Sequence, residues 1–466
     1  MFQRNRRELL RTSALGFGWL ALTDLLSASE PAPPPRAVGA RDPLAPKAPH
    51  FAARAKRVIF LFMHGGPSQI DTFDYKPKLA TDDGKPLPFA KPRVVSSATG
   101  NLLKSPFAFK QYGQSGAWAS ELFPHVAGRA DDLCFIKSMH GSNSRHGGAL
   151  LELHTGSDTF VRPSMGSWVT YGLGTENRDL PGYVTICPTL THGGVNNYSS
   201  AFLPAAYQAT PLGNASTAAS QVTVPFVRGT TAPGQQRLEL DLLADLDRER
   251  ATGADAATEG RIQSFEMAFR MQNTVPAVQD LSKESAETHK LYGIDDKVTE
   301  NFGRQCLMAR RFAEAGVRFV QCTHSYKWDQ HENLKKDHTT NAREVDKPIA
   351  GLLTDLNRRG LLKDTLVVWG GEFGRTPVAQ GKDGRDHNPH GFTMFLAGGG
   401  VKAGFSHGAT DDYGYFAAED KVHVHDLHAT ILHLLGLDHT RLTYRHAGRD
   451  FRLTDVHGEV VDQILA

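Results

Sequence analysis

Six short runs of apolar residues mark the chain, and each ends in a turn rich in glycine or polar residues. The runs cover 57–63, 133–136, 183–187, 317–322, 365–369 and 392–396. A continuous apolar run without alternation is typical of a strand that is buried on both faces. Helical patterns over 301–315, 346–358 and 426–435 follow or precede these runs, and a glycine ends each of them. Strands that alternate with helices predict an α/β protein with a mostly parallel central sheet.

One long segment departs from this alternation. Residues from about 190 to 300 begin as polar loops and continue as two amphipathic stretches, 237–251 and 260–272. Their spacing of apolar residues is helical. We expect a helical insertion or cap on the sheet domain, and no internal repeat is visible.

The N-terminus has the layout of an export signal. The first twelve residues contain four arginines and one acid, and Arg6-Arg7 is followed by two leucines. An apolar run then ends near Leu26. Together, the arginine pair and the apolar run resemble a twin-arginine leader. The apolar run is short and Asp24 interrupts it, so a stable transmembrane span is not expected. An ordinary amphipathic helix is the alternative interpretation.

These features divide the chain into three parts. Residues 1–30 are predicted to be the twin-arginine-type signal, and 31–56 form a linker rich in proline and alanine. Residues 57–466 form the folded domain. We therefore expect a periplasmic or otherwise extracytoplasmic bacterial protein, with the twin-arginine export machinery as a partner.

Composition narrows the function classes. A net charge of +2 provides no field that would recruit nucleic acid or an anionic membrane. The four cysteines form no Cys-x-x-Cys pair, which excludes zinc-ribbon and thioredoxin-like sites, although two disulfides remain possible in an oxidising compartment. The 21 histidines are unusual, and many lie in stretches rich in glycine, aspartate and asparagine. This pattern favours a polar site that binds metal.

The polar clusters follow four of the predicted strands. They cover 64–74, 140–146, 324–338 and 372–390. In parallel sheets the functional site lies beyond the carboxyl ends of the strands. Surface histidines would not follow four separate strands, so this recurrence predicts one active site.

Candidate metal ligands are carboxylates and imidazoles in these clusters. Asp329 and His331 are two residues apart and share a side of an extended loop, which suits a zinc-type pair. Glu372 at a strand end is placed as a ligand or a general base. The alternatives are that Asp71 caps a short helix, that 324–331 is an exposed polar loop, and that Glu372 forms a surface ion pair. The predicted ligands are His64, Asp71, Asp329, His331, Glu372, Asp386, His387 and His390.

Candidate catalytic residues lie around 141–148, between a strand and a predicted helix. A helix N-terminus stabilises an anion, so Ser142 or Ser144 could serve as a nucleophile with His146 as base or ligand. Arg375 could hold an anionic oxygen through two parallel hydrogen bonds. A serine that merely caps the helix explains the segment equally well. The predicted catalytic residues are Ser142, Ser144, His146 and Arg375.

Together these motifs resemble a known family. Their order is the leader, His64-Gly-Gly-Pro-Ser with Asp71, Trp328-Asp-Gln-His331, Gly370-Gly-Glu-Phe-Gly-Arg375, Asp386-His-Asn-Pro-His-Gly391 and Leu434-Leu-Gly-Leu437. The order resembles a bacterial family of uncharacterised, sulfatase-like proteins that is exported by the twin-arginine route and belongs to the alkaline phosphatase superfamily. The resemblance runs from about Arg57 to the C-terminus.

The resemblance implies an alkaline-phosphatase-like α/β/α sandwich with two divalent metal ions, here zinc, calcium, magnesium or manganese. It implies that Asp71 is the metal aspartate of the first strand. Asp329 and His331 then serve one metal site, Glu372 serves the other, and His387 or His390 is the late histidine ligand. Two departures stand out. Glu372-Phe373 replaces the usual Asp-His, and Ser142–Arg145 matches only the end of the formylglycine signature of sulfatases.

The resulting hypothesis is an exported, metal-dependent hydrolase of sulfate or phosphate esters. Its substrate would be a small anionic ester or a sulfated glycan. The alternative is a non-catalytic exported module that binds a sulfated glycan or a partner protein on the same fold. The weak nucleophile motif and Phe373 favour the alternative. A phosphomutase fits poorly with an export signal.

Overall fold

The computed structural model describes residues 42–90, 99–224, 227, 231–250 and 256–466. The predicted signal and the first part of the predicted linker lie outside the described residues. Over the ranges described, none of the helices combines the length and the apolar character that a membrane crossing requires.

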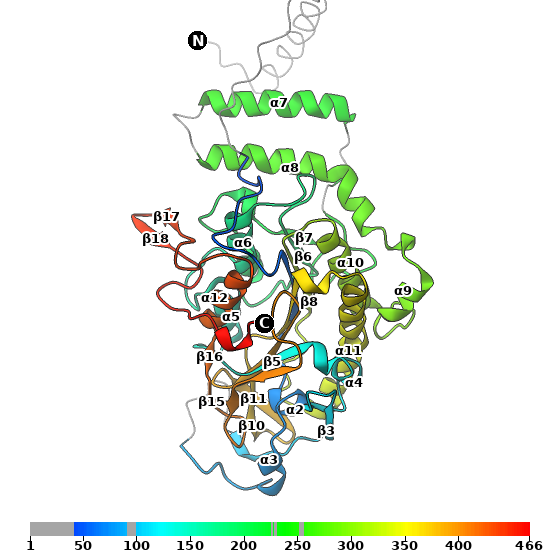
Figure 1. Cartoon of the computed structure of the whole chain (residues 1–466), viewed down its shortest axis with the longest axis vertical. Coiled ribbons are helices and arrows are strands. Elements are labelled where there is room, and N and C mark those ends of the chain that lie inside the picture. Colours follow the sequence, from blue (N-terminus) through cyan, green and yellow to red (C-terminus); the bar gives the residue numbers. More distant parts are fainter. Residues whose placement is uncertain (1–41, 91–98, 225–226, 228–230, 251–255) are drawn as a thin grey trace, which may run out of the picture. The chain divides into compact units, whose positions relative to one another are not determined.

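A nine-stranded sheet forms the centre of the fold (Figure 1). Its strands run in the order β13-β5-β12-β9-β1-β8-β6-β7, and β16 pairs with β5. All pairings are parallel except those of β12, which is antiparallel to both β5 and β9. The bounds are β1 Arg57–Met63, β5 Leu133–His140, β6 Tyr183–Ile186, β7 Thr210–Leu212, β8 Phe319–His324, β9 Thr365–Gly370, β12 Phe392–Ala397, β13 Phe405–His407 and β16 Val422–His423. The predicted α/β class with a mostly parallel sheet is confirmed.

Strand β1 shows why the apolar runs do not alternate. All seven of its residues are buried, because β8 and β9 pair with its two edges and helices cover both faces of the sheet. Val58 lies opposite Phe319 on one side and Leu366 on the other. Each large apolar side chain buried in this way contributes roughly 1.5–3 kcal/mol.

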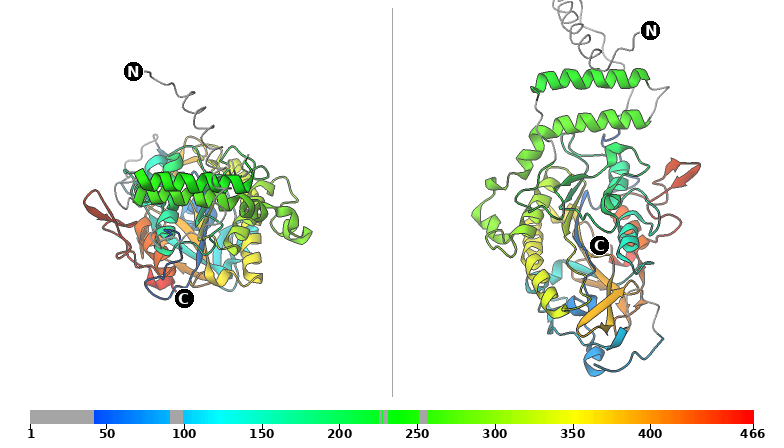
Figure 2. Two further views of the ribbon diagram at one scale, coloured as in Figure 1. Left: turned by 90° about the horizontal axis from the view of Figure 1, so that it is seen from above. Right: turned by 180° about the vertical axis from the view of Figure 1, so that it is seen from behind.

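Helices lie on both faces of this sheet (Figure 2). Helices α10 (Glu300–Glu314) and α11 (Leu334–Arg358) lie on one side. Helices α5 (His146–Thr155), α6 (Met165–Leu173) and α12 (Val424–Leu434) lie on the other. Helix α11 begins twelve residues before the predicted start at 346. Its first turns are rich in polar residues, but Leu334, His338 and Ala342 recur on one buried face.

Within the insertion, α7 (Pro233–Arg250) and α8 (Ala256–Gln279) lie side by side as an antiparallel pair (Figures 1 and 2). They form where the two amphipathic stretches predicted helices. The remaining elements are α2 Gln69–Thr72, α3 Pro77–Thr81, α4 Pro124–Ala127, α9 Ala286–Leu291, β2 Thr99–Leu102, β3 Phe109–Tyr112, β4 Ala117–Ser120, β10 Gly374–Gln380, β11 Gly384–Asn388, β14 Ala409–Thr410, β15 Ala417–Glu419, β17 Tyr444–His446 and β18 Arg449–Phe451.

The polar cluster 372–390 contains a strand that the apolar pattern does not predict. Residues Gly384–Asn388 form β11, which pairs with β10 in a small three-stranded sheet with β2. All five residues of β11 are buried although four are polar. Their partners come from distant parts of the chain, so the local pattern does not show the strand. The register places Arg375 opposite His387.

The four cysteines are free and buried. The possible pair of disulfides does not form. Cys134 and Cys322 lie inside β5 and β8 and pack as small apolar side chains.

Candidate metal centre

Most of the predicted site residues meet beyond the carboxyl ends of the central strands. His64 follows β1, Glu372 follows β9, and Asp329 with His331 follows β8. His146 opens helix α5 after β5, and His387 comes from β11. Three overlapping groups form, in which one ligand atom per residue lies within 4.8 Å of the others. The groups are His64, His146 and His192; His146, Asp329 and His387; and His331, Asp386 and His387.

Asp329 is the centre of this arrangement. Its Oδ1 lies 2.9 Å from Nε2 of His331, 3.0 Å from Nε2 of His387 and 2.6 Å from Nη2 of Arg375. Its Oδ2 lies 3.3 Å from Nε2 of His146. Burial opposes ionisation, but the contacts with His146 and His331 and the positive charge of Arg375 outweigh it and hold the pKa of Asp329 well below its usual range.

The two nitrogens of His387 have opposite roles. Nδ1 lies 2.7 Å from the carbonyl oxygen of Ser144, which can only accept a hydrogen bond, so Nδ1 carries the proton. Burial lowers the pKa of His387 to about 4, so the ring is neutral at pH 7. Its Nε2 therefore presents a lone pair to a carboxylate. An anchored Nδ1–H with a free Nε2 is the arrangement of a histidine that binds metal.

Glu372 and His146 form a buried pair beside this centre. Oε1 of Glu372 lies 2.7 Å from Nδ1 of His146 and accepts the backbone N–H of Gly65 at 3.0 Å. Burial acts to lower the pKa of His146, but its contacts with the carboxylates of Asp329 and Glu372 outweigh burial and raise it. Glu372 thus fixes the orientation of the His146 ring.

His64 contributes a second lone pair. Its side chain is buried, and in the described part of the chain its Nδ1 has no hydrogen-bond partner. Burial lowers the pKa of His64 to about 4, so the ring is neutral at pH 7. Its Nε2 lies 3.3 Å from Nδ1 of His192. A buried imidazole nitrogen without a hydrogen-bond partner is costly unless a ligand completes it.

His192 belongs to the site although the sequence did not single it out. It lies just after β6 in a loop and has a positive φ of 50°. His192-Gly-Gly follows a predicted strand, as His64-Gly-Gly does. That shared pattern is the signal that could have identified it.

Arg375 lies beneath the centre. Its guanidinium is fully buried and donates to the backbone oxygens of Gly65, Gly66 and Trp328 as well as to Asp329. It therefore ties the loop after β1 to the loop after β8. This is a positioning contact, whereas the sequence suggested that Arg375 holds an anionic oxygen.

Two of the predicted ligands lie away from these groups. Asp71 in helix α2 is fully buried and forms a bidentate pair with Arg385, at 2.7 Å to Nε and 3.2 Å to Nη2. His390 stacks against Tyr415 with 6.3 Å between ring centres. Asp386 lies in the third group, where its Oδ1 also accepts the backbone N–H of His387.

The two serines are placed differently. Ser144 reaches the centre through its backbone carbonyl. The hydroxyl of Ser142 lies 3.2 Å from Nε2 of His423. Nδ1 of His423 accepts the backbone N–H of His425, so the proton of this neutral ring is on Nε2. In this tautomer His423 cannot take a proton from Ser142.

The fold and the site define an α/β protein whose sheet carries a carboxylate and imidazole cluster at its carboxyl edge. Residues 55–465 match a family described as a protein of unknown function, DUF1501, and the chain belongs to this family. No curated protein matches the chain.

Several solved structures are similar at low identity. The lipoteichoic acid synthase LtaP from Listeria monocytogenes is 10% identical, covers 88% of this chain and 78% of its own, and gives a TM-score of 0.37. The PsFucS1 sulfatase from Pseudoalteromonas sp. is 13% identical, with 82% and 68% coverage and a TM-score of 0.36. The alkaline phosphatase of the Antarctic bacterium TAB5 is 9% identical, with 83% and 99% coverage and a TM-score of 0.35. At these identities and TM-scores, the solved structures establish no activity for this chain.

Proposed function

We propose that this protein is an exported, metal-dependent hydrolase of anionic esters. The observation that carries the proposal is the neutral His387 ring, which presents a lone pair to the ionised Asp329. Nε2 of His387 and Oδ1 of Asp329 are both acceptors and lie 3.0 Å apart, so one cation can bind to both. The donor set of carboxylate and imidazole suits zinc, manganese or a similar divalent ion.

Each residue has a defined task in this proposal. Asp329, His331 and His387 would hold the ion, and His64 with His192 offers ligand atoms for a second position. A divalent ion held there would polarise an ester oxygen and lower the pKa of a water molecule. Glu372 orients His146 and stabilises its protonated form, so His146 is the residue that accepts a proton from the attacking group.

The nucleophile is the Ser144 hydroxyl or a water molecule. Ser144 adjoins the centre, whereas Ser142 contacts His423. Arg375 keeps Asp329 and the loop after β1 in place and does not contact the substrate. The substrate is a sulfate or phosphate ester of a small molecule, or a sulfated glycan.

Metal content and turnover test the proposal together. The mature protein, purified without chelator, should hold one or two divalent ions and should hydrolyse aryl sulfates or aryl phosphates. Asp329→Ala should lose both properties. Asp245→Ala is the matched control, because Asp245 is exposed on α7. An Asp329→Ala protein that keeps its metal and its turnover would refute the proposal.

Export is a separate part of the proposal. The Arg6-Arg7 pair and the apolar run after it support a twin-arginine signal and an extracytoplasmic location. Arg6→Lys/Arg7→Lys should leave the protein in the cytoplasm of the producing bacterium. Equal distribution of the variant and the native protein between cell fractions would contradict this.

A binding module on the same fold is the second candidate. Two observations favour it. The tautomer of His423 cannot take a proton from Ser142, and the guanidinium of Arg375 donates its hydrogen bonds to the protein itself and not to a substrate. Such a module would bind a sulfated glycan or a partner protein without turnover. Retained binding of a sulfated glycan by Asp329→Ala, with no turnover by either protein, would favour this candidate.

A further inference from the structure

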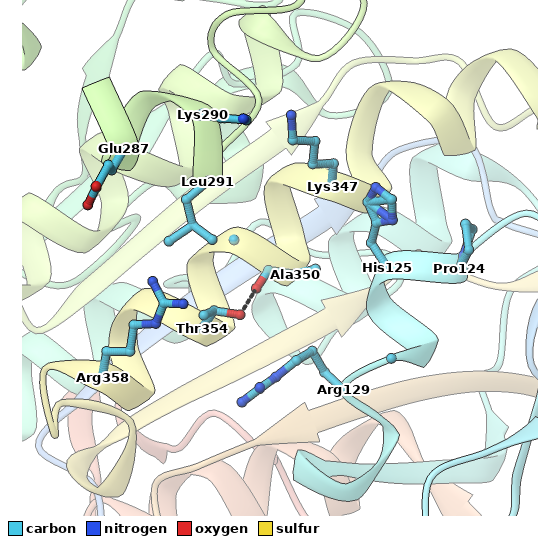
Figure 3. Close-up of a pocket in the computed structure, with 12 residues that line it drawn as sticks. Pro124, His125, Arg129, Glu287, Lys290, Leu291, Lys347, Ala350, Thr354 and Arg358 are labelled. Atoms are coloured by element: carbon cyan, nitrogen blue, oxygen red, sulfur yellow. Dashed lines mark hydrogen bonds between the residues drawn. The ribbon is translucent and has the colours of Figure 1, made fainter. Parts of the chain in front are cut away.

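A pocket of about 630 Å³ lies among helices α4, α9 and α11, and none of its lining residues belongs to the candidate metal centre (Figure 3). Its volume falls within the range of about 300–1,000 Å³ that is usual for small-molecule sites. The pocket lies on the part of α11 that includes Lys347 and Arg358.

Specific contacts hold the walls of this pocket. The Asp346 carboxylate on α11 accepts the backbone N–H groups of His125 at 3.0 Å and Val126 at 2.7 Å, which fixes α4 against α11. On the other side, a Cβ on Gly351 would lie 2.4 Å from the carbonyl oxygen of Leu291. Only glycine allows α9 to approach α11 this closely. These contacts fix the three helices around the pocket relative to one another.

The lining is strongly cationic. Arg129, Lys290, Lys347 and Arg358 line it, and Glu287 is the only acid among its lining residues. Lys347 makes only a 3.6 Å contact with Asp295, which is half-exposed. Arg129 pairs with Asp132 outside the pocket. Figure 3 shows Lys290 and Lys347 in the upper part of the view and Arg129 and Arg358 in the lower part.

Two of these cations have no counter-charge. Among the described residues, neither Lys290 nor Arg358 forms an ion pair, and both are exposed. Like charges that line one pocket repel one another, so an anion bound there would relieve their repulsion. Between the cations the wall is apolar, with Leu291 and Ala350 lining the pocket. The site therefore combines a cationic rim with an apolar wall.

We propose that this pocket binds a small amphipathic anion, with a phosphate, phosphonate, sulfate or carboxylate group on a compact apolar body. The anionic group contacts Lys290 and Lys347, Arg358 adds to the positive potential of the pocket, and the apolar body packs against Leu291. The site is separate from the candidate metal centre. It does not depend on the chemistry proposed there.

Calorimetric titration with phenylphosphonate tests the pocket, because this probe is an anion on an aryl body and has no ester to hydrolyse. The native full chain should bind it, and added salt should weaken binding. Lys290→Glu/Arg358→Glu should weaken it by at least about tenfold. Both side chains are exposed, so the fold should be kept. Lys283→Glu/Lys363→Glu is the matched control, because it makes the same change in net charge at exposed lysines outside the pocket.

Two further titrations show where the probe binds and which part of it the protein recognises. Asp329→Ala should keep the binding event, and benzyl alcohol, which carries no charge, should not bind. The proposal is overturned if the native protein does not bind the probe or if the pocket variant binds it as the control does. It is also overturned if Asp329→Ala abolishes all binding, because the probe then occupies the metal centre.

Discussion

Nε2 of His387 lies 3.0 Å from Oδ1 of Asp329, while the other nitrogen of the same ring is committed to a backbone carbonyl. Two acceptors therefore face each other in a buried setting. Either a cation or an extra proton must compensate this arrangement, and burial disfavours the proton by lowering the pKa of His387 to about 4. The contact with Asp329 distinguishes His387 from His390, the second histidine of the same motif.

We expect His387→Ala to lower metal affinity by more than about tenfold, because loss of even an indirect contact to a metal typically costs 10–100-fold. The protein should remain folded, since Asp329 keeps its contacts with His331 and Arg375. Metal content after dialysis, measured beside the thermal midpoint, provides the test. His390→Ala should keep its metal. Equal loss of metal in both variants would show that the two histidines are not distinguished as the structure suggests.

The buried pair of Asp71 and Arg385 predicts a stability effect without a metal effect. Both side chains are fully buried, so removing one partner leaves an isolated charge. We expect Asp71→Ala to destabilise the protein by about 3–5 kcal/mol in urea unfolding. Metal content per folded molecule should not change.

A double variant keeps this prediction decisive if Asp71→Ala does not fold. Asp71→Leu/Arg385→Met removes both charges and should recover much of the lost stability, because no charge is left unpaired. Loss of metal from the folded double variant would instead make Asp71 a ligand, as the family resemblance implies.

The sequence predicts the sheet and the edge at which the site forms, because both depend on local patterns. The run Arg57–Met63 becomes a buried strand, and polar residues follow it directly. The sequence does not predict which carboxylates face the cluster. Asp71 and Asp329 both follow strands, and only the tertiary contact of Asp71 with Arg385 separates them.

Buried polar residues account for the other differences. His338 ends the predicted polar cluster 324–338, but it lies in α11 and accepts the backbone N–H of Ser68 at 3.1 Å. The sequence pattern does not predict strand β11 for the same reason, because its polar residues pair with residues such as Asp71 that are remote in sequence. Polarity alone cannot show whether a residue lies in an exposed loop or in a satisfied core.

Gly65 is where the loop after β1 meets the loop after β8. It has a φ of +118°, and a Cβ there would lie 2.7 Å from the backbone nitrogens of Trp328 and Asp329. Gly65→Ala should therefore cost roughly 2–4 kcal/mol from backbone strain and overpacking together. It should also reduce metal content, because Asp329 must shift.

Gly84→Ala is the matched control for Gly65→Ala. Gly84 also has a positive φ, of +78°, but no atom lies within 4 Å of the added Cβ. This variant should lose only about 1 kcal/mol and keep its metal. Equal urea midpoints and metal contents for the two variants would contradict the proposed contact between the loops.

His428 predicts how stability changes with pH at a point remote from the metal centre. It lies fully buried in α12, and its Nε2 donates to the carbonyl oxygen of Leu153 at 2.8 Å. Burial, with smaller contributions from neighbouring histidines, lowers its pKa to about 3 from the usual 6.5. The folded state therefore binds fewer protons than the unfolded state between these values. Its contribution to stability is complete above pH 6.5 and is lost as pH falls toward 3, by up to about 1.4 kcal/mol per pH unit.

His428→Gln keeps a donor for Leu153 but cannot take up the proton. Urea unfolding from pH 7 to pH 4 should show a shallower acid slope for the variant than for the native protein, after each is referred to its own value at pH 7. Parallel slopes would mean that His428 does not remain neutral in the folded state.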